Sequence, residues 1–111
     1  MKIKLATVFS GIGAIEFALK RLNIEHDIVF ACDNGEREVS YDLEKEREAV
    51  RKLNSIDEKR KYVDNLYLSL TSSKNYVEQS YLANYPHCSK NRYFQDVVLL
   101  DGRDFHNQVD L

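Results

Sequence analysis

The sequence predicts an α/β fold, because residues 3–32 have the pattern of a strand, a glycine turn, a helix and a second strand. Residues 3–9 (Ile-Lys-Leu-Ala-Thr-Val-Phe) are rich in apolar and β-branched side chains and stop at a Ser-Gly pair, which is typical of a short strand that ends in a turn. Residues 27–32 (Asp-Ile-Val-Phe-Ala-Cys) contain a continuous apolar run, which favours a strand covered on both faces, as in a parallel sheet. The crossover between the two strands is expected to be right-handed.

A helix is expected between these strands, because apolar residues recur at helical spacing after Gly13. Lys20 and Arg21 lie outside the apolar set, as in an amphipathic helix, and Asn23 is placed to end it. The predicted apolar face comprises Ile15, Phe17, Ala18, Leu19 and Leu22.

A third strand is predicted over residues 94–100 (Phe-Gln-Asp-Val-Val-Leu-Leu), followed by a turn at Asp101-Gly102. Three parallel strands bury both faces of a sheet poorly, and 111 residues make one small domain at most. The sequence therefore predicts that residues 1–111 form part of a larger parallel sheet.

The middle of the chain has a different character, since residues 36–61 are dominated by Glu, Lys and Arg with few apolar residues. Residues 62–70 and 76–85 resume an apolar pattern at helical spacing, which stops at Pro86. We interpret residues 36–79 as a charged helical insertion with a solvated surface. A contact with nucleic acid or with a partner protein is the alternative.

The composition limits the classes of function. A hydrophobic content of 43% and a charged content of 31% suit a soluble domain, and neither an apolar run of membrane-spanning length nor a signal peptide is present. A cytoplasmic protein without a membrane partner is therefore expected. The net charge of −2 provides no basic excess, so most of any DNA-binding surface has to lie elsewhere. Cys32 and Cys88 form no CxxC pair or zinc spacing, and no metal site is predicted.

The glycine turn after the first strand is the first candidate site. Its residues are Phe9, Ser10, Gly11, Ile12 and Gly13. Glycines there let the backbone approach a ligand closely, and the helix start offers unpaired N–H groups. The dinucleotide pattern G-x-G-x-x-G would need a third glycine where this chain has Glu16. A carboxylate at that point is awkward for a pyrophosphate, so the turn favours S-adenosylmethionine over a nicotinamide dinucleotide.

Two acidic residues extend the candidate site. Asp33 follows the second strand, where an acid accepts hydrogen bonds from ribose hydroxyls; capping of the Asn34-Gly35 turn is the alternative role. Asp104 follows the predicted third strand and is expected to accept an adenine amino group, with Phe105 packed against the ring. Ordinary turn chemistry is the alternative there.

These motifs resemble the N-terminal part of the DNA cytosine-5 methyltransferases. Phe9-Ser-Gly-Ile-Gly13 with Glu16 and Leu19 is similar to the first motif of that family, and Ala31-Cys-Asp33 to its ribose-binding motif. Tyr81-Leu-Ala-Asn-Tyr-Pro86, Asp101-Gly-Arg-Asp-Phe105 and Val109-Asp-Leu111 resemble three later stretches, the last being the opening of the strand that leads to the catalytic loop. Residues 36–79 have no counterpart in the family.

The resemblance implies a partial Rossmann-like S-adenosylmethionine-dependent methyltransferase fold of three parallel strands with a helical insertion. It implies no catalytic residue in this chain, because the Pro-Cys nucleophile and the target-recognition segments of the family lie beyond Leu111. DNA would be bound through the complete enzyme, and a second subunit carrying the missing parts is an expected partner. The predicted cofactor-binding residues are Phe9, Ser10, Gly11, Ile12, Gly13, Glu16, Asp33, Asn34, Asp104 and Phe105.

Two alternatives remain open from the sequence. One is a non-catalytic S-adenosylmethionine-binding or interaction subunit, whose charged insertion recruits a partner. The other is a different Rossmann-type enzyme, which would use a nicotinamide cofactor or methylate a small molecule.

Overall fold

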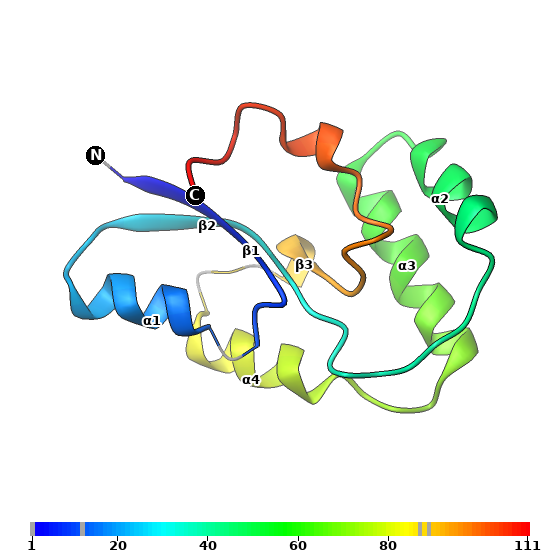
Figure 1. The fold of residues 1–111 in the computed structure, drawn as a ribbon, viewed down its shortest axis with the longest axis horizontal. Coiled ribbons are helices and arrows are strands. Elements are labelled where there is room, and N and C mark those ends of the chain that lie inside the picture. Colours follow the sequence, from blue (N-terminus) through cyan, green and yellow to red (C-terminus); the bar gives the residue numbers. More distant parts are fainter. Residues whose placement is uncertain (1, 12, 87, 89) are drawn as a thin grey trace.

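The chain forms a parallel β-sheet with helices on both of its faces (Figure 1). A computed structural model describes residues 2–11, 13–86, 88 and 90–111. The strands β1 (Ile3–Val8), β2 (His26–Cys32) and β3 (Tyr93–Phe94) lie in the order β1-β2-β3, and both pairs are parallel. The predicted α/β class with three parallel strands is confirmed, and the arrangement is compatible with a partial Rossmann-like fold.

Helix α1 (Ala14–Arg21) lies between β1 and β2 as the sequence predicts. Asn23 follows it with a positive φ of 54°, a conformation common just after helix ends. The predicted apolar face is only partly buried, because Leu19 is covered while Ile15, Phe17 and Leu22 are exposed. The second buried side chain of α1 is the carboxylate of Glu16, which the pattern of apolar residues did not indicate.

The two faces of the sheet pack against different elements. On one face, Ala31 of β2 and Tyr93 of β3 pack with Tyr81 of helix α4 (Tyr76–Asn84). On the other face, Phe30 of β2 packs with Phe105 of the short 3₁₀ helix η2 (Gly102–Phe105), and Phe94 of β3 belongs to the same cluster. Successive residues of β2 and β3 thus point to opposite sides, as the strand period of two requires.

The last residues of the chain lie along the free edge of β1. The backbone N–H of Leu111 donates to the Lys4 carbonyl oxygen at 3.2 Å, and the N–H of Ala6 donates to the Leu111 carbonyl oxygen at 2.9 Å. These two bonds on either side of Leu5 are the pattern of a parallel strand pair. Leu111 therefore lies beside β1 in parallel register, on the edge of the sheet opposite β2.

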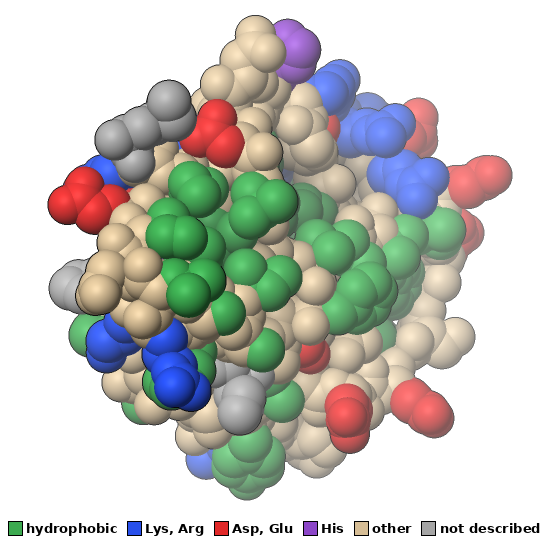
Figure 2. All heavy atoms as spheres, turned by 60° about the vertical axis from the view of Figure 1, so that its left-hand side comes forward, with side chains coloured by type: hydrophobic (Ala, Val, Ile, Leu, Met, Phe, Trp, Pro, Cys, Tyr) green, Lys and Arg blue, Asp and Glu red, His purple; other side chains and the backbone are tan. Residues whose placement is uncertain are grey.

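Hydrophobic side chains gather on the side of the molecule that carries β1 and α1 (Figure 2). The exposed large hydrophobic residues of β1, α1 and the C-terminal segment are Val8, Ile15, Phe17, Val109 and Leu111. The sheet edge is therefore apolar as well as incompletely paired.

The segment expected to be a charged insertion contains helices α2 (Leu43–Arg51) and α3 (Ile56–Leu70). Each helix begins at a side-chain cap, since Asp42 accepts from the Lys45 N–H and Ser55 from the Glu58 N–H. The segment is more than a solvated excursion, because its apolar side chains form a core together with Leu99 from the chain after β3. That core contains Val50, Val63, Tyr67 and Leu99.

None of the helices in the described part of the chain has the length and apolar character of a membrane span.

The predicted third strand is wrong in its extent. β3 ends at Phe94, and a turn over residues 97–99 follows instead of a strand over residues 94–100. The Val98 N–H donates to the Asp96 carboxylate at 2.9 Å, which turns the chain away from the sheet. Leu99 then packs into the core of the α2–α3 segment. The apolar run of residues 97–100 is therefore partly used to bury the insertion, a tertiary effect that overrides strand propensity.

We predict that Gly13→Ala destabilises the fold through α4. Gly13 has a φ of +87°, and a Cβ there would overlap the ring of Tyr85. Left-handed strain of about 1–2 kcal/mol and overpacking of about 1–3 kcal/mol should both lower the free energy of unfolding in urea. Gly11→Ala is the matched control, because its φ of +56° carries similar strain but no atom lies within 4 Å of the added Cβ. Equal losses in the two variants would contradict the packing role of Gly13.

Candidate functional site

The parallel strands end at one edge of the sheet, and an open groove of about 560 Å³ lies there. Phe9 follows β1, Asp33 follows β2 and Asp96 follows β3, and all three line the groove. The opposite wall comes from residues 37–43, which lead into α2, and from Tyr67 of α3. Ligands of open α/β sheets bind outside the carboxyl ends of the strands, so this groove is the candidate site.

Asp33 joins the glycine turn to the end of β2. One carboxylate oxygen accepts the Gly11 N–H at 2.9 Å, and the other accepts the Gly35 N–H at 2.8 Å. Ser10 makes a second connection, because its hydroxyl accepts the Cys32 N–H at 3.1 Å. Phe9 has a φ of 52° and its side chain is 76% exposed. The bonds of Ser10 and Gly11 therefore fix the turn against the end of β2, while the exposed Phe9 side chain lines the groove.

Asp96 accepts three hydrogen bonds. Its Oδ2 accepts the hydroxyls of Tyr41 at 2.5 Å and Tyr67 at 2.7 Å, and its Oδ1 accepts the Val98 N–H at 2.9 Å. Burial raises the pKa of both tyrosines, and the hydrogen bond to Asp96 raises it further. Both hydroxyls therefore remain protonated donors at neutral pH.

The basic side chain at the groove is occupied by protein contacts. The Arg37 guanidinium donates to the Asn34 carbonyl oxygen at 2.8 Å and to the Gln95 side chain, and it lies 4.8 Å from the centre of the Tyr67 ring. Asp33, Glu38 and Asp96 also line the groove. The groove lining therefore carries more negative than positive charge, because Arg37 balances only one of the three acids.

Glu16 lies away from the groove, beneath the glycine turn. Its carboxylate accepts the Thr7 hydroxyl at 3.0 Å and the Tyr81 hydroxyl at 2.8 Å, and its side chain is 1% exposed. Burial and the hydrogen bond to Glu16 both raise the pKa of Tyr81. Glu16 thus connects α1 to β1 and α4, and its side chain is among the most buried of the molecule.

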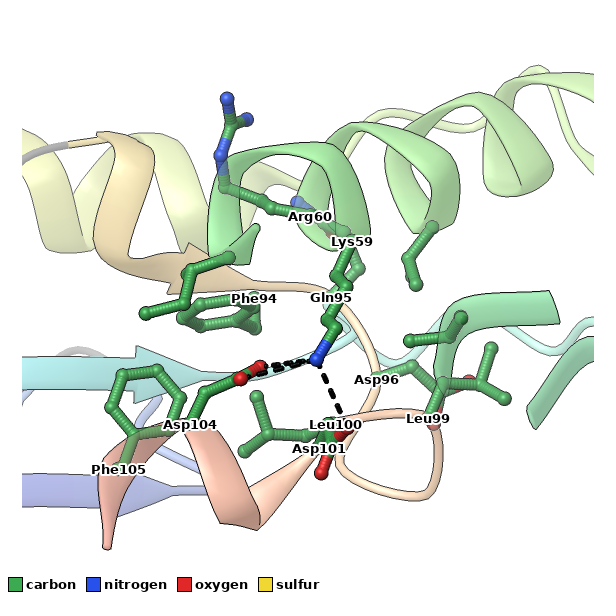
Figure 3. Close-up of a pocket in the computed structure, with 13 residues that line it drawn as sticks. Lys59, Arg60, Phe94, Gln95, Asp96, Leu99, Leu100, Asp101, Asp104 and Phe105 are labelled. Atoms are coloured by element: carbon green, nitrogen blue, oxygen red, sulfur yellow. Dashed lines mark hydrogen bonds and ion pairs between the residues drawn. The ribbon is translucent and has the colours of Figure 1, made fainter. Parts of the chain in front are cut away.

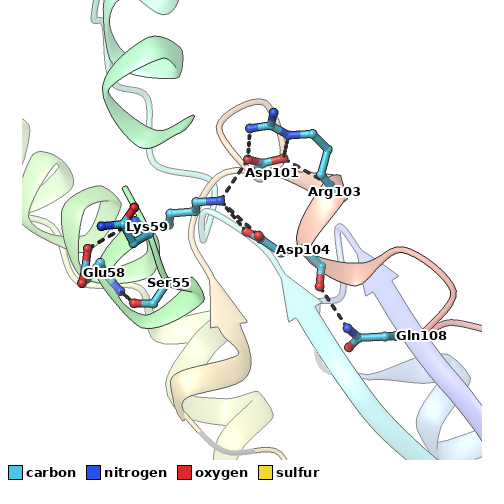
Figure 4. Close-up of polar contacts among 8 residues, drawn as sticks. Ser55, Glu58, Lys59, Asp101, Arg103, Asp104 and Gln108 are labelled. Carbon is cyan, nitrogen blue, oxygen red and sulfur yellow. Dashed lines mark hydrogen bonds and ion pairs between the residues drawn. The ribbon is translucent and has the colours of Figure 1, made fainter. Parts of the chain in front are cut away.

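Asp104 and Phe105 lie apart from the groove, on η2. The Lys59 ammonium of α3 contacts Asp104 at 2.8 Å and Asp101 at 3.0 Å, and Arg103 also contacts Asp101 (Figure 4). Phe105 is packed against Phe30, with the ring centres 4.6 Å apart. Since β3 ends at Phe94, the acid at its carboxyl end is Asp96, and the strand-end position expected for Asp104 is wrong.

The pocket beside Lys59 is too small for a nucleoside. Figure 3 shows Lys59 reaching from α3 toward Asp104 and Asp101, beside the apolar side chains of Phe94, Leu100 and Phe105. Its volume is about 10 Å³, which is the space of about one water molecule. This pocket is a gap in the interior, where the buried ion pairs tie the insertion to η2.

The residues predicted from the sequence thus divide into groups. Phe9, Asp33 and Asn34 line the groove, and Ser10 and Gly11 are bonded beside it. Gly13 and Glu16 are buried, and Asp104 and Phe105 face another part of the interior. Ile12 lies outside the described residues.

Sequence reasoning missed most of the groove lining, including Asp96, Tyr41 and Tyr67. Asp96 carries a local signal, since it follows a short apolar pair at the end of β3, but the apolar run after it obscured the strand end. Tyr41 and Tyr67 carry none, because they lie in the insertion and reach the groove only through tertiary packing.

Among the described residues, no group of three or more His, Cys, Asp or Glu side chains is arranged to hold a metal ion. No family model, curated protein or solved structure matches this chain. The functional conclusion therefore depends on the geometry of the groove and on the motifs in the sequence.

We predict that Asp101 contributes stability that is lost in acid. Its hydrogen bonds to Arg103 and Lys59 hold the pKa of the Asp101 carboxyl well below its usual range. The contribution is therefore complete above the unfolded-state pKa of about 4 and is lost as the pH falls toward the folded-state pKa. Asp101→Asn should lower the free energy of unfolding by about 1–3 kcal/mol at pH 7 and reduce its acid dependence.

Urea titrations between pH 7 and pH 2 measure this difference. The exposed Asp57 provides a control, because Asp57→Asn removes the same charge at a surface position. An acid dependence that is unchanged in Asp101→Asn would contradict the role of the Lys59–Asp101–Arg103 contacts.

Proposed function

We propose that this chain is the S-adenosylmethionine-binding portion of a DNA cytosine-5 methyltransferase, with the groove as the methyl-donor site. The observation that carries the proposal is the Asp33 carboxylate, which holds the Gly11 N–H at 2.9 Å and lines the groove. A glycine turn after one strand and an acid after the next are the two parts of a nucleoside site. The bond between them places both at one edge of the sheet.

The charges of the groove favour this cofactor over a dinucleotide. Asp33, Glu38 and Asp96 line it, while Arg37 is occupied by protein acceptors. A pyrophosphate would bring negative charge toward these carboxylates, whereas a sulfonium and an amino group bring positive charge. The sequence attributes this preference to Glu16, but Glu16 is buried against Thr7 and Tyr81. In this proposal the preference comes from the acids of the groove instead.

The groove residues take distinct roles in this proposal. Asp33 accepts hydrogen bonds from the ribose hydroxyls, since each carboxylate oxygen has a lone pair beyond its backbone partner. Asp96, in place of Asp104, accepts the amino group of the adenine. Phe9 and Val97 supply apolar contact. When bound, the cofactor supplies the methyl group.

Catalysis in this proposal requires the complete enzyme. Burial raises the pKa of the Cys32 thiol to about 12 and that of the Cys88 thiol to about 11, with acidic neighbours adding to the shift, so neither is a thiolate nucleophile at neutral pH. The Pro-Cys loop and the target-recognition region would come from later segments or from a second subunit, and DNA would be bound through them.

A non-catalytic S-adenosylmethionine-binding or interaction subunit is the second candidate. The apolar residues exposed on α1 and at the edge of β1 favour it, since such surfaces commonly contact a partner. Both candidates share the groove and differ in what completes the sheet edge.

The proposal predicts that the chain binds S-adenosylmethionine and not NAD. Isothermal titration of the purified chain with each compound tests it, because the acidic groove should repel the pyrophosphate of NAD. Adenosine is a useful third ligand, since it shares the nucleoside with both. Binding of NAD without binding of S-adenosylmethionine would reject the proposal.

Asp33→Ala should weaken S-adenosylmethionine binding by about 1–3 kcal/mol, because it strands hydrogen-bonded groups of the ligand. Asp33→Asn is the conservative comparison, since its amide oxygen still accepts one of the two backbone N–H groups. Both variants are measured by the same titration, alongside their unfolding in urea. Wild-type affinity in a folded Asp33→Ala variant would remove Asp33 from the site.

A further inference from the structure

The insertion contributes two side chains to the most buried acid of the groove. Tyr41 precedes α2 and Tyr67 lies in α3, and their hydroxyls converge on the same oxygen of Asp96. Tyr67 is 2% exposed. The turn after β3 has a bond of its own, since the Val98 N–H donates to the other oxygen of Asp96.

The three donors limit what else Asp96 can accept. A carboxylate offers about four acceptor positions, two on each oxygen. Tyr41 and Tyr67 fill those of Oδ2, and the Val98 N–H fills one of Oδ1. One acceptor position on Oδ1 remains for a ligand donor. An amino group can donate an N–H to this position. A carbonyl oxygen cannot, because it and the carboxylate are both acceptors and would repel each other.

The same hydroxyls also fix the wall of the groove. Residues 37–42 have neither helical nor strand structure, and they cross the strand ends between two contacts. Arg37 is bonded to Gln95 at one end, and Tyr41 is bonded to Asp96 at the other. Both anchors follow β3 directly, so the wall is attached to the residues that it faces.

We propose that Tyr41 and Tyr67 are positioning residues, which orient the Asp96 carboxylate toward a single ligand amino group and hold the insertion as a wall of the ligand site. This inference rests on the proposed function for the identity of that amino group, the exocyclic amine of adenine. The charged insertion is thereby part of the binding site and determines which nucleoside it accepts.

The test compares Tyr41→Phe, Tyr67→Phe and Tyr62→Phe. Tyr62 is the matched control, because its hydroxyl donates to the Glu46 carboxylate at 2.5 Å between α3 and α2, away from the groove. Each variant removes one tyrosine–carboxylate bond of the insertion. Their affinities for S-adenosylmethionine, adenosine and inosine are measured by isothermal titration, and their unfolding is measured in urea. Inosine differs from adenosine by a carbonyl oxygen in place of the amine.

The expected result separates positioning from stability. Tyr41→Phe and Tyr67→Phe should bind S-adenosylmethionine about three- to tenfold more weakly, the effect of one hydrogen bond. Their preference for adenosine over inosine should shrink toward one, while Tyr62→Phe keeps both values of the wild-type chain. If all three variants lose the same unfolding free energy, lost stability cannot explain a change of ligand preference that is confined to Tyr41→Phe and Tyr67→Phe.

A second measurement uses the wild-type chain alone. With tyrosine labelled at Cζ by carbon-13, adding adenosine should shift the resonances of Tyr41 and Tyr67 and leave that of Tyr62 in place. This readout keeps the inference testable if Tyr67→Phe does not fold.

The outcomes distinguish the two claims. If the wild-type chain binds S-adenosylmethionine and Tyr41→Phe and Tyr67→Phe bind it as well, with an unchanged preference for adenosine, the positioning role is overturned and the proposed function stands. If the wild-type chain binds neither S-adenosylmethionine nor adenosine, the proposed function fails and the positioning role fails with it.

Discussion

The bonds from the Gly11 and Gly35 N–H groups to the Asp33 carboxylate organise the carboxyl edge of the sheet. The bond from Gly11 ties the turn after β1 to Asp33, which lies 22 residues further along the chain. The bond from Gly35 holds the turn after β2 itself. The Asn75 side chain donates to the Asp33 carbonyl oxygen at 2.8 Å, which brings the start of α4 to the same place. Removing this acid would leave two partly buried N–H groups without their acceptor, which costs more than the loss of a surface contact. The geometry of the groove therefore depends on Asp33 before any ligand is considered.

Three acids of this small domain illustrate how environment sets role. Glu16, Asp33 and Asp96 all accept two or more hydrogen bonds from the protein. Glu16 is enclosed by Thr7 and Tyr81 beneath the turn, so it serves the interior. Asp33 and Asp96 border open space at the strand ends, so lone pairs that the protein leaves unused are available to a ligand.

Much of the fold could be predicted from local pattern. The strand, turn, helix and second strand of residues 3–32 follow from apolar periods and glycine placement, and Pro86 marks the end of α4 correctly. The third strand could not be delimited, because residues 97–100 are apolar enough for a strand but Leu99 packs with the insertion. Local sequence does not reveal which of two cores an apolar run will join.

The candidate site shows the same division. Phe9 and Asp33 were found from the sequence because they follow strands directly. Glu16 was expected at the cofactor site, because a carboxylate at a helix start is ordinarily solvated. It is buried instead, and the hydroxyls of Thr7 and Tyr81 supply the hydrogen bonds that a buried carboxylate needs. Tyr41 and Tyr67 depend on how α3 lies across the end of β3, which is a property of the assembled fold.

The insertion and the sheet are bound together by polar contacts as much as by apolar packing. Lys59 bridges Asp101 and Asp104, and Arg37 reaches Gln95, so α3 and the segment before α2 are each bonded to the chain that follows β3. Buried polar groups tolerate few alternative arrangements, because each misplaced donor or acceptor loses its partner. A shift of the insertion would therefore disturb Gln95 and Asp96 together. The wall of the groove and the acid that it faces therefore form one unit. The charged side chains of Arg37 and Lys59, which belong to the segment first interpreted as solvated, make contacts that hold this unit in place.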